Sequence, residues 1–211
     1  MPLQNRVTPF GEIVVSAARG TLMGNRGCLH DAERRLTGRR WTTRAWVTCA
    51  LSFNGRRRQL MTPGFYTELF FLDEATALAA GHRPCAECRR SAYRSFKERW
   101  AEGAGLAIDG LAVAEIDRTM HADRLDATRR QRTSPGRVDG LPAGTMVAVD
   151  GAALLLWDGV LRPWRAEGYG EPLSLPADTA CDVLTPRSTV AALRAGYRPA
   201  VHDSARAGPL S

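Results

Sequence analysis

The run GHRPCAECRR at residues 81–90 constrains the fold of this chain more than any other feature. Cys85 and Cys88 are separated by two residues, and a turn of this kind supplies half of a tetrahedral metal site. The remaining ligands have to come from elsewhere in the sequence, so the fold must bring a distant segment against this turn. We therefore expect a fold organised around a metal site at residues 81–90.

Local patterns predict an α+β fold around this site, with a small mixed β-sheet, β-hairpins and short helices. Asp73 is placed to cap a helix and Gly81 to end it. Asn54 and Gly55 form the dipeptide that favours a tight hairpin turn. The expected strands lie at residues 12–16, 45–53, 57–61 and 65–72, and the expected helices at residues 73–80 and 87–100.

The second half of the chain is predicted to be richer in strands. Residues 145–164 are typical of a β-meander, because two Asp-Gly pairs separate short apolar segments. A basic helix is expected at residues 115–130, and a strand followed by a helix at residues 181–195. We divide the chain into a zinc-knuckle α+β domain at residues 1–103, a basic helix and linker at residues 104–144, and a β-rich half at residues 145–202.

One sequence pattern occurs twice. Residues 75–85 read ATALAAGHRPC, and residues 190–200 read VAALRAGYRPA. Both predict an alanine-rich helix, a glycine stop, an aromatic ring and an Arg-Pro pair. The second segment lacks the cysteines, although His202 follows it. We expect a duplicated, degenerate knuckle; two ordinary helix ends in an alanine-rich chain are the alternative.

The run FFLDEATALAAGHRPCAECRR resembles the zinc-binding module of the Ada-type DNA methylphosphotriester repair proteins. That family combines paired aromatics, a short helix ending in Ala-Ala-Gly, and Arg-Pro-Cys followed by two residues and a second Cys. The matching positions are Phe70, Phe71, Ala79, Ala80, Gly81, Arg83, Pro84, Cys85 and Cys88. The resemblance covers about residues 65–90 and implies zinc binding by the two cysteines, together with DNA contact.

This chain departs from the family at its first cysteine pair. The segment GRRRQLMTPG stands where that pair is expected, and it has no cysteine. One cysteine of the missing pair accepts the methyl group in the repair proteins, so the self-methylating activity does not transfer.

Cys28 and His30, in the loop GNRGCLHD, are favoured as the missing ligands. A Cys-x-His pair on extended backbone points both side chains to the same side. The expected zinc ligands are therefore Cys28, His30, Cys85 and Cys88. A closed set would be structural, whereas an open position would hold a reactive water. The other candidates are Cys49 and Cys181, which are typical of strand cores, His82, which occupies an aromatic packing position, and His121 and His202.

The composition favours phosphate as a binding partner. The net charge is +7, and Lys97 is the only lysine, so nearly all of the positive charge is arginine. Guanidinium groups bind phosphate oxygens in pairs. A skewed residue composition explains some of this charge, but most arginine clusters lie near a candidate ligand or histidine. The expected nucleic-acid-binding residues are Arg26, Arg83, Arg89, Arg90, Arg118 and Arg124.

Asp117 and His121 form a second candidate site. They are four residues apart on the expected helix, and a carboxylate beside an imidazole raises its basicity. This pair is half of a hydrolytic site, although a surface ion pair is the simpler interpretation. A redox role for the CxxC turn is disfavoured, because no βαβ pattern surrounds it.

The favoured function is therefore a zinc-binding protein that binds DNA or RNA, with DNA preferred, in nucleic-acid repair or processing. A metal-dependent or histidine-based phosphodiester hydrolase and a protein-partner-binding module are the alternatives, so enzymatic activity stays open. No apolar run approaches the roughly 18 residues that span a bilayer, and the N-terminal segment has no signal-peptide core, so we expect a cytoplasmic protein. Five cysteines in that reducing compartment argue against a disulfide framework.

Overall fold

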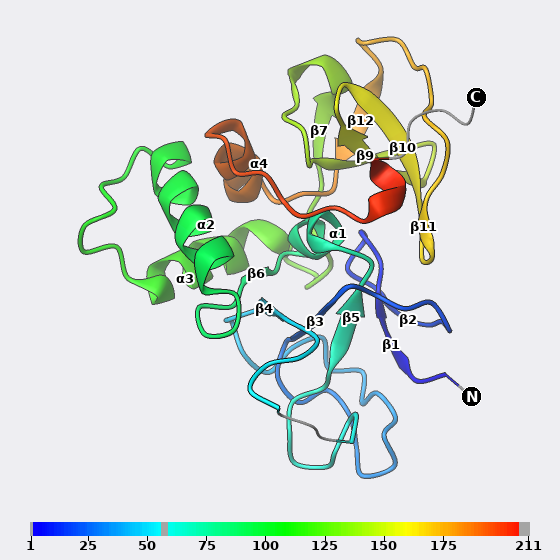
Figure 1. The fold of residues 1–211 in the computed structure, drawn as a ribbon, viewed down its shortest axis with the longest axis vertical. Helices are drawn as coiled ribbons and strands as arrows, with labels where there is room; N and C mark the ends of the chain where they lie inside the picture. Colours follow the sequence, from blue (N-terminus) through cyan, green and yellow to red (C-terminus); the bar gives the residue numbers. More distant parts are fainter. Residues whose placement is uncertain (1, 56–58, 207–211) are drawn as a thin grey trace.

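The computed structural model describes residues 2–55 and 59–206, and it is an α+β fold with two six-stranded sheets (Figure 1). The N-terminal sheet has the strand order β2-β1-β5-β3-β4-β6. Two of its pairs, β1 with β5 and β4 with β6, are parallel, and the others are antiparallel. The bounds are β1 Gln4–Val7, β2 Ile13–Val15, β3 Leu22–Asn25, β4 Val47–Cys49, β5 Leu69–Phe71 and β6 Arg83–Pro84.

The C-terminal sheet is antiparallel throughout and has the order β11-β10-β9-β8-β12-β7. Its centre is the meander expected at residues 145–164, with positive φ at both residues of the Asp150-Gly151 and Asp158-Gly159 turns. The bounds are β7 Ser134–Arg137, β8 Met146–Val149, β9 Ala152–Trp157, β10 Val160–Arg165, β11 Gly168–Tyr169 and β12 Ala180–Val183.

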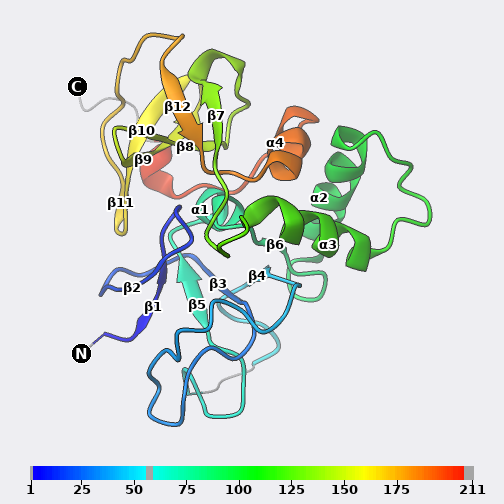
Figure 2. The same cartoon turned by 180° about the vertical axis from the view of Figure 1, so that it is seen from behind.

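The helices form a third group. Helices α2, α3 and α4 lie together on one side of the molecule, whereas α1 lies between the two sheets (Figures 1 and 2). Phe96 and Trp100 of α2 pack with Ile116 and Met120 of α3 and with Leu193 of α4. The bounds are α1 Glu74–Ala79, α2 Arg90–Gly103, α3 Val113–Arg124 and α4 Arg187–Arg194, with short 3-10 turns at Val138–Gly140 and Asp203–Ala205.

Helix α1 is buried along its whole length and joins the separate parts of the core. Ala75 and Ala79 pack into the cluster beneath the C-terminal sheet, Leu78 into the helical cluster, and Ala77 into the cluster beneath the N-terminal sheet. Small alanine side chains let all three layers approach this short helix closely. The two sheets therefore share one continuous interior around α1.

The predicted helix boundaries of α1 are confirmed in detail. Asp73 accepts a hydrogen bond from the backbone N–H of Thr76 at 2.9 Å, as an N-cap residue should. Gly81 has φ +80°, and the N–H of His82 bonds to the carbonyl of Ala77 at 2.9 Å.

Other boundaries differ from the expectation. Asn54 and Gly55 have the positive φ values of the predicted turn, but residues 59–61 form no return strand, and residues 56–58 lie outside the described part. The basic helix ends at Arg124 and not at residue 130. Its continuation is a loop because Asp126 accepts hydrogen bonds from the N–H groups of Thr128 and Arg130.

Within residues 2–55 and 59–206, we find no helix with the length and apolar character needed to cross a bilayer.

Candidate metal centre and arginine-lined pocket

Three cysteines meet where β4 and β6 run parallel. Val47 pairs with Arg83 and Thr48 with Pro84, and the N–H of Cys85 donates to the carbonyl of Thr48 at 2.9 Å. This register carries Cys49 to the side of Cys85, and the CxxC turn brings Cys88 back toward both. The three sulfurs lie within 4.8 Å of one another, so together they can hold a metal ion.

The electrostatics of this cluster favour one thiolate among the three sulfurs in the absence of a cation. A hydrogen bond with Cys49, followed by backbone N–H groups of Cys88 and Glu87, lowers the pKa of Cys85 to about 5. The same contact with Cys85, together with burial, raises the pKa of Cys49. Burial and the neighbouring Cys85 also raise the pKa of Cys88. A bound cation would reverse this competition by stabilising all three thiolates.

Cys28 and His30 do not join this cluster, contrary to the ligand set expected from the sequence. Both ring nitrogens of His30 have other partners, with Nδ1 2.6 Å from the hydroxyl of Thr67 and Nε2 3.2 Å from the carbonyl of Thr62. The sulfur of Cys28 faces the carbonyl of His30 at 3.7 Å. In the part of the chain that the structure describes, Cys49, Cys85 and Cys88 are the only group of three or more His, Cys, Asp or Glu side chains close enough to hold a metal ion.

The sequence favours Cys49 as a core residue over its role as a candidate ligand, because the alternation along β4 assigns the wrong face of this strand to the core. Val47, Cys49 and Leu51 alternate like buried residues, yet Leu51 is 54% exposed. The buried face carries Trp46 and Thr48 instead. The available signal was Trp46, whose large ring gains more from burial than a cysteine does. Residues three apart on a strand lie on opposite faces, so burial of Trp46 turns Cys49 away from the core.

The expected Asp117–His121 pair is not formed. Both carboxylate oxygens of Asp117 accept hydrogen bonds from Arg83, at 2.7 and 2.8 Å, and this ion pair is almost entirely buried. His121 Nδ1 lies 3.0 Å from Arg124. Its ring packs edge-on against Trp41 at 5.3 Å between centroids. Asp117 therefore anchors Arg83 and leaves His121 without a carboxylate partner in these contacts.

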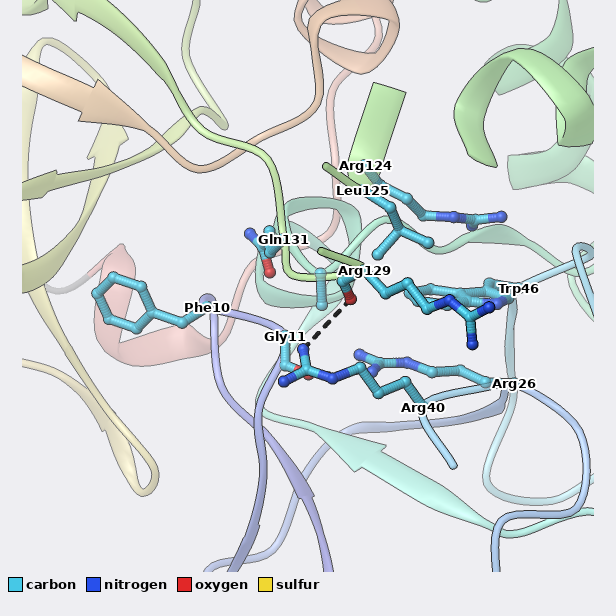
Figure 3. Close-up of a pocket in the computed structure, with 10 residues that line it drawn as sticks. Phe10, Gly11, Arg26, Arg40, Trp46, Arg124, Leu125, Arg129 and Gln131 are labelled. Atoms are coloured by element: carbon cyan, nitrogen blue, oxygen red, sulfur yellow. Dashed lines mark hydrogen bonds between the residues drawn. The ribbon is translucent and has the colours of Figure 1, made fainter. Parts of the chain in front are cut away.

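Two of the predicted phosphate-binding arginines lie against Trp46. The guanidinium of Arg124 is 4.0 Å and that of Arg26 is 4.3 Å from the ring centroid. Figure 3 shows the ring between these two side chains. Both arginines are buried, with exposed fractions of 2% and 4%. Gly81 has to be glycine here, because an added Cβ would lie 2.6 Å from Arg124 Cδ.

Only some of the N–H groups of these two guanidiniums have hydrogen-bond partners. Arg26 Nη1 donates to the carbonyl of Gly11 at 2.9 Å, but its buried Nη2 has no hydrogen-bond partner among the described residues. Arg124 Nη1 donates to the carbonyl of Gly81 at 2.6 Å, whereas its buried Nε has no partner there. Burial, reinforced by neighbouring arginines, lowers the pKa of each to about 9.

A small pocket opens beside this stack (Figure 3). It offers about 20 Å³ to the centre of a water-sized group. The exposed Arg40 and Arg129 line it with Arg26 and Arg124, and Arg40 Nη1 donates to the carbonyl of Arg129 at 3.4 Å. The other lining residues are Phe10, Gly11, Trp46, Ala80, Leu125 and Gln131, so four arginines and no carboxylate line it among the described residues.

The remaining predicted arginines do not converge on one spot. Arg89 is held inside the fold, because it donates to the hydroxyl of Thr48 at 2.8 Å and pairs with Glu74 at 2.9 Å. Arg90 and Arg118 are exposed on α2 and α3. The predicted set thus separates into two pocket arginines, two structural arginines and two surface arginines.

No protein-family model, no curated protein and no solved structure matches this chain.

Proposed function

We propose that this chain is a zinc protein that binds nucleic acid through phosphate contacts, with DNA preferred over RNA and with zinc as a structural clamp. The Ada-like run belongs to this proposal as the zinc-binding turn. The observation that carries the proposal is a pair of buried arginines, Arg26 and Arg124, on one tryptophan, beside a pocket lined by further arginines and no acid.

Zinc is the favoured metal because of its ligand chemistry. Thiolates are soft ligands that suit zinc, and a tetrahedral ion with Zn–S bonds of about 2.3 Å separates its sulfurs by about 3.8 Å. The three sulfurs within 4.8 Å of one another fit that separation after small rotations. Cys49, Cys85 and Cys88 would hold the ion, and a fourth ligand would come from solvent or a bound partner.

The clamp and the pocket are linked through two short strands. Trp46 immediately precedes β4, and Cys49 ends it; His82 precedes β6, and Cys85 follows it. The ring of His82 lies 5.2 Å from that of Trp46. Metal binding at one end of this strand pair would therefore hold Trp46, and with it the arginine stack, in place at the other end.

Phosphate is the anion that best matches the pocket. Buried guanidiniums repel one another, and a bound anion would supply the negative charge that the pocket lacks. Arginine forks match phosphate oxygens in pairs. The hydrolase alternative receives no support from the contacts, because Asp117 is committed to Arg83 and does not activate His121.

Fluorescence anisotropy with a labelled DNA strand tests this proposal. We expect the double variant R40Q/R129Q to weaken DNA binding by about tenfold or more and to reduce the slope of log affinity against log salt by about 1 to 2. The control is R165Q/R94Q, which removes the same charge from exposed positions on β10 and α2 outside the pocket. Equal losses in both double variants would indicate nonspecific attraction, and no binding by the native chain would overturn the proposal.

A further inference from the structure

The arginine pocket has features that select one kind of phosphate. Its four guanidiniums come from two distant parts of the chain: Arg26 and Arg40 lie between β3 and β4, and Arg124 and Arg129 lie at and just beyond the end of α3. A site built from two distant parts of the chain depends on the tertiary fold and is more than a run of arginines in the sequence. It is therefore a defined binding position and not a diffuse basic surface.

The charge of the pocket exceeds what one phosphodiester offers. An internal phosphate of a nucleic acid carries one negative charge, whereas a phosphate monoester carries about 1.5 to 2 charges at pH 7 and three terminal oxygens. Arg26 Nη2 and Arg124 Nε are buried and have no hydrogen-bond partner among the described residues, and the exposed Arg40 and Arg129 line the same pocket. This number of donors matches a monoester better than a diester.

The size of the pocket also favours a phosphate monoester over a diester. Its space of about 20 Å³ for the centre of a water-sized group admits one compact group and no nucleobase. Gln131 forms one wall and is held in place, because the carbonyls of Pro9, Ala79 and Leu184, 2.8 to 3.1 Å from its amide nitrogen, share its two N–H groups. A terminal phosphate presents three oxygens with one chain attached, whereas an internal phosphate carries the strand on both sides and presents two.

An aromatic ring lies next to one of the pocket arginines. The guanidinium of Arg129 lies 5.8 Å from the ring centroid of the half-buried Trp41. Bases stack on exposed aromatic faces without sequence preference, so Trp41 is placed to receive the base next to a phosphate held by Arg129.

We infer that the pocket lined by Arg26, Arg40, Arg124 and Arg129 binds the terminal phosphate monoester of a nucleic-acid strand. This inference rests on the proposed nucleic-acid-binding function and narrows it to strand ends. The terminal phosphate supplies the specific contact, and Trp41 stacks on the adjoining base.

The test compares single-stranded DNA oligonucleotides that carry a phosphate or a hydroxyl at the 5′ end, each labelled at the opposite end, and the matching pair at the 3′ end. We expect the native chain to bind one phosphorylated end at least about tenfold more tightly than its hydroxyl counterpart. R40Q/R129Q should bring that ratio close to 1, and R165Q/R94Q should preserve it. The variant W41A should weaken phosphorylated and hydroxyl strands alike.

The outcomes separate this inference from the proposed function. Salt-dependent DNA binding that ignores the phosphorylation of both ends would overturn the inference and leave the proposed function standing. A native chain that binds no oligonucleotide, yet gains thermal stability from inorganic phosphate, would overturn both in favour of a small phosphorylated ligand. No response to either probe would overturn both without a replacement.

Discussion

The two Gly-aromatic-Arg-Pro segments share a backbone and differ in what stabilises them. Gly81 and Gly196 have φ values of +80° and +102°. The N–H of His82 bonds to the carbonyl of Ala77 at 2.9 Å, and the N–H of Tyr197 bonds to that of Ala192 at 3.0 Å. The same helix end therefore occurs twice. A duplication would leave this pattern, and a glycine after any short helix gives it as well.

Beyond the glycine, the two segments use different chemistry. The first continues into β6 and the cysteine cluster, and its Arg83 is buried against Asp117. The second has no cysteine and leaves Arg198 exposed over the ring of Trp157 at 5.8 Å.

The second segment is held by two carboxylates at the start of α1. Tyr197 donates its hydroxyl to Glu74 at 2.8 Å, the N–H of Ala200 donates to the same carboxylate at 2.9 Å, and the N–H of His202 donates to Asp73 at 3.0 Å. The first segment thus carries the candidate metal cluster and one buried ion pair, whereas two buried acids hold the second. The comparison teaches that the turn itself is too short to be stable and needs a partner in each case.

Removing a ligand sulfur should have the largest effect. We expect C49S and C85S each to lower the zinc content from about one ion per chain to near zero and to destabilise the N-terminal sheet, because metal binding contributes directly to folding. Elemental analysis with thermal denaturation measures both quantities. Chelation of the native protein should produce the same loss of stability.

Cys28 supplies the matched control for that experiment. C28S should keep the native zinc content, because Cys28 lies outside the cluster of three sulfurs. Loss of zinc in C28S with retention in C49S would restore the ligand set that the sequence favours and refute the one described above.

Disrupting the second segment should have a smaller but still large effect. Glu74 is buried and also pairs with Arg89, so E74Q removes a charge that three donors share. We expect the free energy of unfolding to fall by about 3 kcal/mol, as for other broken buried pairs. Urea denaturation followed by tryptophan fluorescence measures this, with E102Q as an exposed control on α2. Equal stability of E74Q and the native chain would show that the second segment needs no buried acid.

Local features of the two segments could be predicted from the sequence, whereas their long-range partners could not. Helix caps, glycine stops and the meander are local signals, so Asp73, Gly81 and the Asp-Gly turns were predictable from neighbouring residues. The partner of the CxxC turn depends on the parallel pairing of β4 with β6, which joins residues far apart in the sequence. No local pattern contains that register, and alternation along β4 even favoured the wrong face.

The arginines show the same limit. Arg26 and Arg124 were singled out by charge alone, and their meeting on Trp46 required the fold. Asp117 and His121 have the spacing of a helical pair, yet Arg83 reaches Asp117 from β6 with two hydrogen bonds. A buried bidentate arginine is a stronger partner for a carboxylate than a neighbouring histidine, and only tertiary structure brings it there.

The two segments also differ in the aromatic residue that follows the glycine. This difference should have the smallest effect on stability. His82 is fully buried between Trp46 and Phe71, and burial, followed by the charges of Arg26 and Arg124, lowers its pKa well below the ordinary value. An unfolded chain takes up a proton on this histidine as the pH falls below about 6.5, whereas the folded chain does not. Stability present above that pH is therefore lost as the pH decreases toward the folded pKa.

The variant H82F should remove this part of the pH dependence, so that its first segment resembles the second, where Tyr197 has no proton to gain. Between pH 7.5 and 5.5 we expect the native chain to lose about 1.4 kcal/mol more stability than H82F. The hydrogen bond that His82 Nε2 accepts from Arg26 at 3.4 Å is lost at every pH and cancels in this difference, as do the other histidines. Parallel stability curves for the two proteins would mean that His82 is protonated inside the fold, which would require an acid or a bound anion beside Arg26 to compensate its charge.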